Sequence, residues 1–213
     1  MMVASTVRTR RDRWADWLVI GIVAVALLLG WAVKAWAVGG RESFTDSETG
    51  LILNYPAGWL ISSAEDYVFR ARDPNSGSFK TTYQVTADKL DPARPMSLMD
   101  AINATSVNRA RKLTSFRLLD IEPVDEGGQA LLADIDTADE EPEAPRAIWS
   151  RYVYVEENPD PFRESLPAVV LGLDYTAVKG EYLCTFTLLS GEADFGAAEK
   201  DFKAFIRDAG FSG

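Results

Sequence analysis

The residues best suited to bind a metal ion form a short acidic run. Asp139, Glu140, Glu141 and Glu143 fall within five residues, and carboxylate oxygens are ligands that Ca²⁺ prefers. The run lacks the alternating oxygen ligands and central glycine of an EF-hand loop, and the prolines beside it indicate an exposed, extended loop. Of the three interpretations of this run, a solvated loop is favoured most. Docking on a basic patch of a partner comes second, and a Ca²⁺ site is favoured least. We therefore predict no metal site and name these four carboxylates as candidate partner-binding residues.

A second candidate contact site is the proline-rich segment 158–167. Its prolines restrict the backbone, and it carries the apolar side chains Phe162 and Leu166 beside Arg163. The apolar side chains either pack over a sheet edge or form a small contact surface. We name Phe162, Arg163 and Leu166 as candidate partner-binding residues.

The composition excludes several kinds of catalysis. The chain contains no histidine and one cysteine, so Ser-His-Asp and Cys-His nucleophilic catalysis, imidazole-bound metals and internal disulfides are excluded. Cys184 lies in an apolar stretch and is expected to be a small core residue. Carboxylate or Ser-Lys chemistry remains open in principle, but no motif points to it. We predict no enzymatic activity, no catalytic residue and no cofactor.

Residues 17–38 are apolar around the whole helix circumference, with no charge before Lys34. As a helix, they would span about 33 Å, enough to cross a hydrocarbon core of about 30 Å. Tryptophan side chains and a lysine at the two ends suit the membrane interface, and we assign this role to Trp14, Trp17, Trp31, Lys34 and Trp36. Four arginines precede the span, and such positive charge normally stays in the cytoplasm. These are Arg8, Arg10, Arg11 and Arg13. The sequence therefore predicts a single-pass anchor.

A cleaved signal peptide is the alternative for this segment. The residues 35–37, Ala-Trp-Ala, resemble an A-x-A cleavage site. However, the apolar run exceeds the usual h-region, and Lys34 lies just before that site. We expect no lipoprotein, because the single cysteine, Cys184, is far from this junction and no thiol is available there for lipidation.

Charge and hydropathy divide the chain into three parts. We expect a basic cytoplasmic N-terminus at 1–13, a transmembrane helix at 14–38 and an extracytoplasmic domain at 39–213. The chain has 22 basic and 32 acidic residues, and 5 of the basic and 2 of the acidic ones precede residue 41. Residues 41–213 therefore carry 17 basic and 30 acidic residues, a net charge of −13. So acidic a domain is a poor candidate for binding nucleic acid, and an anionic leaflet would repel it.

The periodicity of the domain predicts mostly antiparallel strands and two helices. Ser97 and Asp100 form a capping signature, and residues 194–209 carry a narrow apolar stripe that suits packing on a sheet. Gly210 is predicted to end that helix. The predicted strands are 51–55, 67–72, 79–88, 116–124, 130–138, 147–156, 168–178 and 181–189, and the predicted helices are 97–113 and 194–209.

At this point the chain resembles the PsbP-like family, the group named for the extrinsic photosystem II protein, which shares an α/β/α sandwich with the Mog-type Ran-binding proteins. The resemblance rests on residues 50–59, GLILNYPAGW, on 127–130 before a strand, and on the strand 182–189 leading into an aromatic-rich helix. It covers about residues 43 to 211 and implies an α+β domain, an α/β/α sandwich with a largely antiparallel sheet. It also implies an extrinsic subunit or assembly factor rather than an enzyme.

Three departures limit what the resemblance transfers. This chain has a predicted anchor where many relatives are soluble, it lacks histidine for any imidazole metal site, and nothing in it identifies a photosystem. We therefore predict a membrane-anchored, non-catalytic accessory subunit that binds a membrane protein complex of unknown identity, with lipid contact through 14–38 and no nucleic acid. The alternative is a cell-envelope small-ligand binder or a carboxylate-based enzyme.

The first prediction concerns topology. Because the arginines precede the span, Met1 should be cytoplasmic and Gly213 extracytoplasmic. Alkaline phosphatase fused after Gly213 should be active, and green fluorescent protein exported by the same route should be dark. The reverse pattern would contradict the topology, and a mature chain beginning at Val38 would show cleavage.

Overall fold

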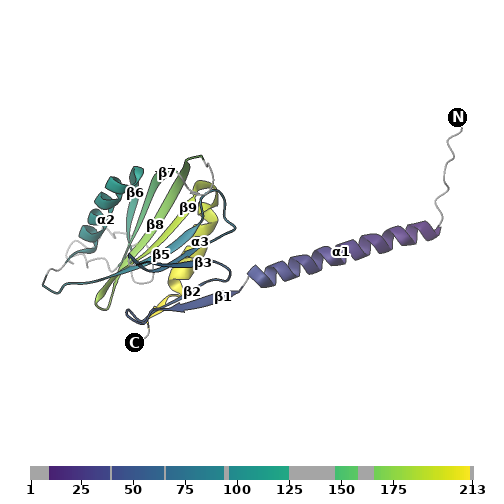
Figure 1. Cartoon of the computed structure of the whole chain (residues 1–213), viewed down its shortest axis with the longest axis horizontal. Coiled ribbons are helices and arrows are strands. Elements are labelled where there is room, and N and C mark those ends of the chain that lie inside the picture. Colours follow the sequence, from purple (N-terminus) through teal and green to yellow (C-terminus); the bar gives the residue numbers. More distant parts are fainter. Residues whose placement is uncertain are drawn as a thin grey trace, which may run out of the picture.

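The computed structural model describes residues 10–38, 40–64, 66–93, 96–124, 147–157 and 166–211. A long helix precedes a domain built from strands and two further helices (Figure 1). In chain order the elements are α1 (Arg10–Val38), β1 (Arg41–Thr45), β2 (Leu51–Pro56), β3 (Leu60–Ala64), β4 (Tyr67–Arg72), β5 (Thr82–Lys89), α2 (Leu98–Lys112), β6 (Thr114–Val124), β7 (Ala147–Glu156), β8 (Ala168–Lys179), β9 (Tyr182–Gly191), α3 (Glu192–Arg207) and β10 (Gly210–Phe211).

The domain is organised around one large antiparallel sheet. In the described residues it has seven strands in the order β3-β4-β5-β9-β8-β7-β6, and every neighbouring pair is antiparallel. Neighbouring residues of a strand point to opposite faces, and on β7 Ile148 packs with α2 whereas Trp149 packs with α3. The two helices therefore cover opposite faces, which confirms the predicted α+β class with a largely antiparallel sheet.

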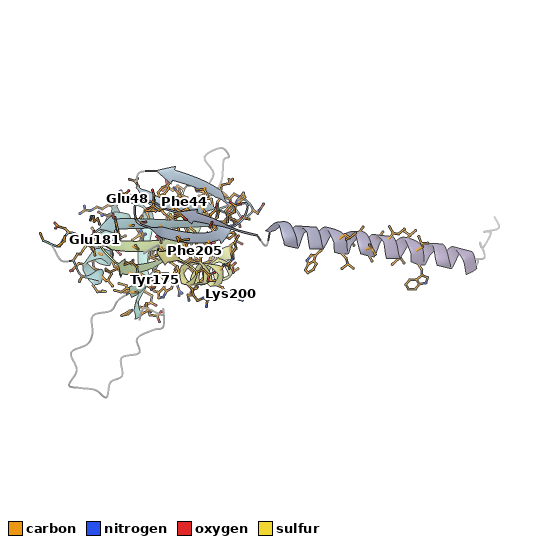
Figure 2. All side chains as sticks on the ribbon, turned by 90° about the horizontal axis from the view of Figure 1, so that it is seen from below. Phe44, Glu48, Tyr175, Glu181, Lys200 and Phe205 are labelled. Carbon is orange, nitrogen blue, oxygen red and sulfur yellow. The ribbon has the colours of Figure 1, made fainter. Side chains whose placement is uncertain are left out.

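The main core lies between the sheet and α3 and is mostly aromatic. Phe202 and Phe205 are buried on the inner side of α3, and their rings lie 5.2 and 5.0 Å from the ring of Tyr83 on β5. Figure 2 labels Phe205 in this layer and Lys200 at the outer surface of the domain. Cys184 is fully buried in the same core, and this burial raises the pKa of its thiol to about 11. The predicted apolar stripe is thus a packing face.

A second, smaller sheet covers the β4 side of this core. β2 pairs with β1 and with β10, and its alternate residues Leu51, Leu53 and Tyr55 are buried. The rings of Phe44 and Tyr55 lie 5.2 and 5.4 Å from that of Phe69 on β4. The sequence predicted β2 but not β1, β3 or β10.

The face under α2 is polar instead. Asp174 on β8 is buried and forms an ion pair with Arg109 of α2. Thr187 Oγ1 donates to the same carboxylate at 2.8 Å, and Tyr152 Oη does so at 3.4 Å. Gly172 makes room for the Tyr152 ring, because a Cβ there would lie 2.1 Å from it. The helix is therefore held by charge and hydrogen bonds as much as by apolar contact.

The covering layers are narrower than the sheet. Seven strands spaced by about 4.8 Å span roughly 29 Å, whereas a helix with its side chains is about 10–12 Å across. On one face α3 packs over β8 and β9 and the small sheet covers β4; on the other, α2 contacts β6, β7 and β8. Within the described ranges, two regions have no covering element: β6 and β7 beside α3, and β3 and β4 on the opposite face.

The first helix extends away from the domain in both views (Figures 1 and 2). α1 includes the predicted segment 14–38, and its side chains are described from Trp17 to Trp31, which are 73% and 71% exposed. Across the described residues no helix is long and apolar enough to cross a membrane.

Two local predictions differ from the structure. The strand expected at 79–88 begins only at Thr82, because the turn after Asp73 continues to Lys80, whose Nζ donates to two carbonyls of that turn. Gly210 does not end α3. The helix ends at Arg207 with Asp208 as its C-cap, and Gly210 instead pairs with Ile52 of β2.

The second prediction tests the α3 core. Phe202→Asp places a carboxylate among the rings that bury Phe202, so it should cost about 4 kcal/mol or more and unfold the domain. Ala197→Asp introduces the same group at an exposed position of α3 and should change the free energy of unfolding by about 0.5 kcal/mol or less. Chemical denaturation followed by circular dichroism compares the two. Equal stability would show that α3 is not part of the core.

Candidate functional site

A cavity lined by described residues lies beside α3, over parts of β6 and β7 that α3 does not cover. It is an open groove of about 540 Å³, which we call the α3 groove. Half-buried Trp149 forms the accessible aromatic part of its floor, over the buried rings of Tyr175 and Phe186, and its rim carries charges of both signs. The charged rim residues are Asp120, Glu122, Arg151, Lys179, Glu199, Lys203 and Arg207.

The strand register explains this composition. Glu122 on β6 lies opposite Trp149 on β7, which lies opposite Tyr175 on β8, which lies opposite Phe186 on β9. Side chains in such a row share one face of the sheet. The row is therefore charged at the open edge and becomes apolar where α3 covers the sheet.

Trp149 is the central residue of the floor. Its ring lies 4.9 Å from that of Tyr175 and 6.4 Å from that of Phe202, so two neighbours in the core hold it in place. The ammonium of Lys203 lies 5.7 Å from the centre of its ring, within the range of a cation–π contact. The Trp149 ring is therefore held by packing and partly screened by the side chain of Lys203.

Glu199 links the helix to the strands at the rim. Its Oε1 accepts from Arg151 Nη2 at 3.0 Å and from Lys203 Nζ at 2.8 Å. Burial opposes ionisation, but the hydrogen bonds and charges of Lys203 and Arg151 outweigh it and hold the pKa of Glu199 below its usual range. Nε of Arg151 is buried and has no hydrogen-bond partner among the described atoms.

These properties suit binding better than proton transfer. A general acid at neutral pH needs a carboxyl whose pKa is raised towards 7, whereas that of Glu199 is lowered. Fixed aromatic rings and arginine are, in contrast, the groups that dominate protein contact sites. The α3 groove can take an apolar or aromatic side chain between flanking charges of either sign.

A smaller cavity of about 140 Å³ lies under α2 and is lined mainly by polar side chains. It contains the ion pair of Arg109 and Asp174. Burial disfavours the charge of Arg109, but Asp174 outweighs this effect and raises its pKa. Since Asp174 already accepts from Arg109, Thr187 and Tyr152, this pair has a complete structural role in fixing α2.

The structure does not test the contact roles predicted from the sequence. Leu166 is 87% exposed. The other candidates of the two loops lie outside the described residues, so their roles stay predictions. They are Asp139, Glu140, Glu141, Glu143, Phe162 and Arg163. Of the predicted interface residues, Trp17 and Trp31 are exposed, while the side chains of Trp14, Lys34 and Trp36 lie outside the description.

Sequence reasoning did not identify the α3 groove. One signal was present: the strand 147–156 alternates two apolar faces, and Arg151 interrupts one of them. The contact of Arg151 with Glu199 joins residues 48 positions apart, and no local pattern indicates such a distant pairing.

Comparisons with known proteins bear on the fold alone. No protein-family model matches the chain, and no curated protein matches it. Among solved structures, cyanobacterial PsbP (CyanoP) from Synechocystis sp. PCC 6803 is similar, with a TM-score of 0.54 and 14% identity over 83% of this chain and 94% of that one. This similarity confirms the PsbP-like fold that the sequence predicted.

Two weaker similarities were also found. The Ran-binding protein Mog1p of Saccharomyces cerevisiae has a TM-score of 0.47 and 8% identity over 81% of this chain and 95% of that one. A protein of unknown function from Pseudomonas aeruginosa has a TM-score of 0.45 and 16% identity over 79% of this chain and 94% of that one.

The third prediction uses the pKa of Glu199. Because this pKa is lower in the folded than in the unfolded chain, the carboxylate stabilises the fold above the ordinary glutamate value of 4.5, and the contribution is lost as the pH falls through the folded-state value. Glu199→Gln should cost about 1 kcal/mol or less near pH 7, since the site is partly exposed, and less near pH 3. Urea denaturation at both pH values measures the difference. A difference that grows on acidification would contradict the ion-pair assignment.

Proposed function

We propose that the chain is a membrane-anchored, non-catalytic accessory or assembly subunit whose extracytoplasmic domain binds and stabilises a membrane protein complex. The α3 groove is the observation that carries this proposal. It is open, it has a preformed aromatic floor, and its ionisable groups are arranged for recognition. The PsbP-like resemblance of the sequence supports the same class of function.

The α3 groove favours a protein segment as its ligand. Tryptophan and arginine are among the side chains most often responsible for binding energy at protein interfaces, and the half-buried Trp149 and Arg151 meet here above the buried Tyr175. A rim with charges of both signs favours one orientation of a partner over others, because like charges placed together cost free energy. Lys203 can move from the Trp149 ring when an apolar side chain enters.

The anchor is the second part of the proposal. Residues 17–33 carry no charge, four arginines precede them, and α1 runs as one helix through residues 17–38. An anchor restricts the domain to the plane of the membrane and raises its effective concentration near a membrane partner. Even a weak groove contact would then be occupied. The loops at 139–145 and 158–167 remain candidate additional contacts.

A cell-envelope ligand binder is the second candidate function. The α3 groove, at about 540 Å³, falls within the range of small-molecule sites, about 300–1,000 Å³. The aromatic floor would suit a planar, charged molecule. The carboxylate-enzyme alternative has less support, because the half-buried carboxylate of the groove has a lowered pKa.

The fourth prediction tests partner binding through the α3 groove. Lys203→Glu with Arg207→Glu reverses two exposed charges at the rim. It should remove the protein from a large assembly on native gels of gently solubilised membranes. Arg111→Glu with Lys112→Glu makes the same charge change at exposed positions of α2 and should leave the assembly intact.

Equal thermal melting of the two variants would exclude unfolding as the cause. If both variants co-migrate with the assembly, the α3 groove is not the contact. If the wild type migrates only as a monomer and its deletion leaves every membrane complex intact, the assembly proposal is wrong. The ligand-binding alternative would then be preferred.

A further inference from the structure

Two arginines lie on the second region without a covering element among the described residues. This region is formed by β3 and β4, on the sheet face opposite α3. Arg70 and Arg72 are two residues apart on β4, so they point to the same face. Across the pairing, Arg72 lies opposite Leu60 and Arg70 lies opposite Ser62 of β3. We call these four residues the β3–β4 corner.

The β3–β4 corner has an excess of positive charge. Arg41, Arg109 and Arg151 each pair with a carboxylate, whereas Arg70 and Arg72 have no carboxylate partner within the part of the chain that the structure describes. The Nε of Arg70 is moreover buried without a hydrogen-bond partner there. In a domain with a net charge of −13, two neighbouring guanidinium groups that lack a carboxylate partner among the described residues favour anion binding.

Nearby groups respond to this charge. Burial and the charge of Arg70 lower the pKa of Arg72. The Ser62 hydroxyl lies 3.3 Å from that of Tyr67, and Ser62, Arg70 and Arg72 together lower the pKa of Tyr67 against the effect of burial. The guanidinium of Arg70 also lies 5.5 Å from the centre of the Tyr67 ring. Negative charge is thus favoured at this position.

The corner also exposes apolar side chains on an edge strand. Leu60 of the corner is 62% exposed, and Ile61, which points to the other face of β3, is 46% exposed. The opposite edge strand, β6, carries charged residues, a proline and two register shifts, features that protect a sheet edge from unwanted contacts. Described residues of β3 include no charge or proline, so this edge resembles a contact surface.

The position of the corner identifies the kind of surface it meets. Ala57 N–H donates to the carbonyl of Gly40 at 2.9 Å, and Gly40 lies two residues after the end of α1. Leu60 follows three residues after Ala57. The start of β3 is therefore tied to the point where the domain joins α1.

We infer that the β3–β4 corner docks on the anionic headgroup layer of the bilayer that holds α1, with Arg70 and Arg72 binding phosphate oxygens and Leu60 entering the interface. This inference rests on the anchor of the proposed function. Bidentate arginine contacts suit phosphate, and apolar side chains beside cations suit a membrane surface. The negative charge of the remaining domain repels the same surface, so it favours the one orientation in which the corner approaches.

The fifth prediction compares lipid compositions with the full chain in nanodiscs. Hydrogen exchange of β3 amides should be about tenfold slower with phosphatidylglycerol present than in pure phosphatidylcholine, since two arginines each add to binding at an anionic surface. Arg70→Gln with Arg72→Gln should abolish the difference. Lys89→Gln with Arg117→Gln removes the same charge at exposed positions away from the corner and should preserve it.

The outcomes separate the possible explanations. Protection that is equal in both lipids, or that both double variants lose equally, would overturn the inference. If glycerol phosphate slows the hydrogen exchange of β3 amides in pure phosphatidylcholine, the corner binds free phosphate rather than a membrane surface, and the inference is wrong. Carbonate extraction of the same chain from liposomes tests α1 independently: an extracted chain contradicts the anchor and the docking together, whereas an inserted chain without lipid-dependent protection contradicts the docking alone.

Discussion

The architecture depends on shielding both faces of one wide sheet with few covering elements. The tilted ring contacts of Phe202 and Phe205 with Tyr83 fix α3 over the centre of one face, and the ion pair of Arg109 with Asp174 fixes α2 over the other. Neither helix can cover the full width of about 29 Å. The exposed remainder of each face is where the groove and the β3–β4 corner lie.

The two uncovered regions lie diagonally across the sheet. The α3 groove uses the β6–β7 side of one face, and the β3–β4 corner uses the other edge and the opposite face. A ligand of one surface therefore does not obstruct the other. A rigid sheet between them would hold a partner at a fixed distance and angle from whatever surface meets the corner.

Sequence patterns predicted the elements whose two faces differ in polarity. The stripe through Phe195 and Phe202 marked α3, and Ser97 marked the start of α2. β1 and β3 escaped prediction because they are short and mostly exposed, so their residues show no alternation. The α3 groove escaped because it depends on which strands become neighbours: Trp149 and Glu199 lie far apart in sequence, and only the strand order and the position of α3 bring them to one site.

Cys184 lies fully buried where β9 crosses the centre of the sheet. A thiol reacts as its thiolate, and both burial and a pKa of about 11 suppress that form in the native domain. Alkylation of Cys184 therefore requires the core to open, so its rate reports opening of the sheet centre. Cys184 is thus a natural single-site probe of unfolding. A cysteine introduced at an exposed position would be labelled selectively, because Cys184 hardly reacts in the folded domain.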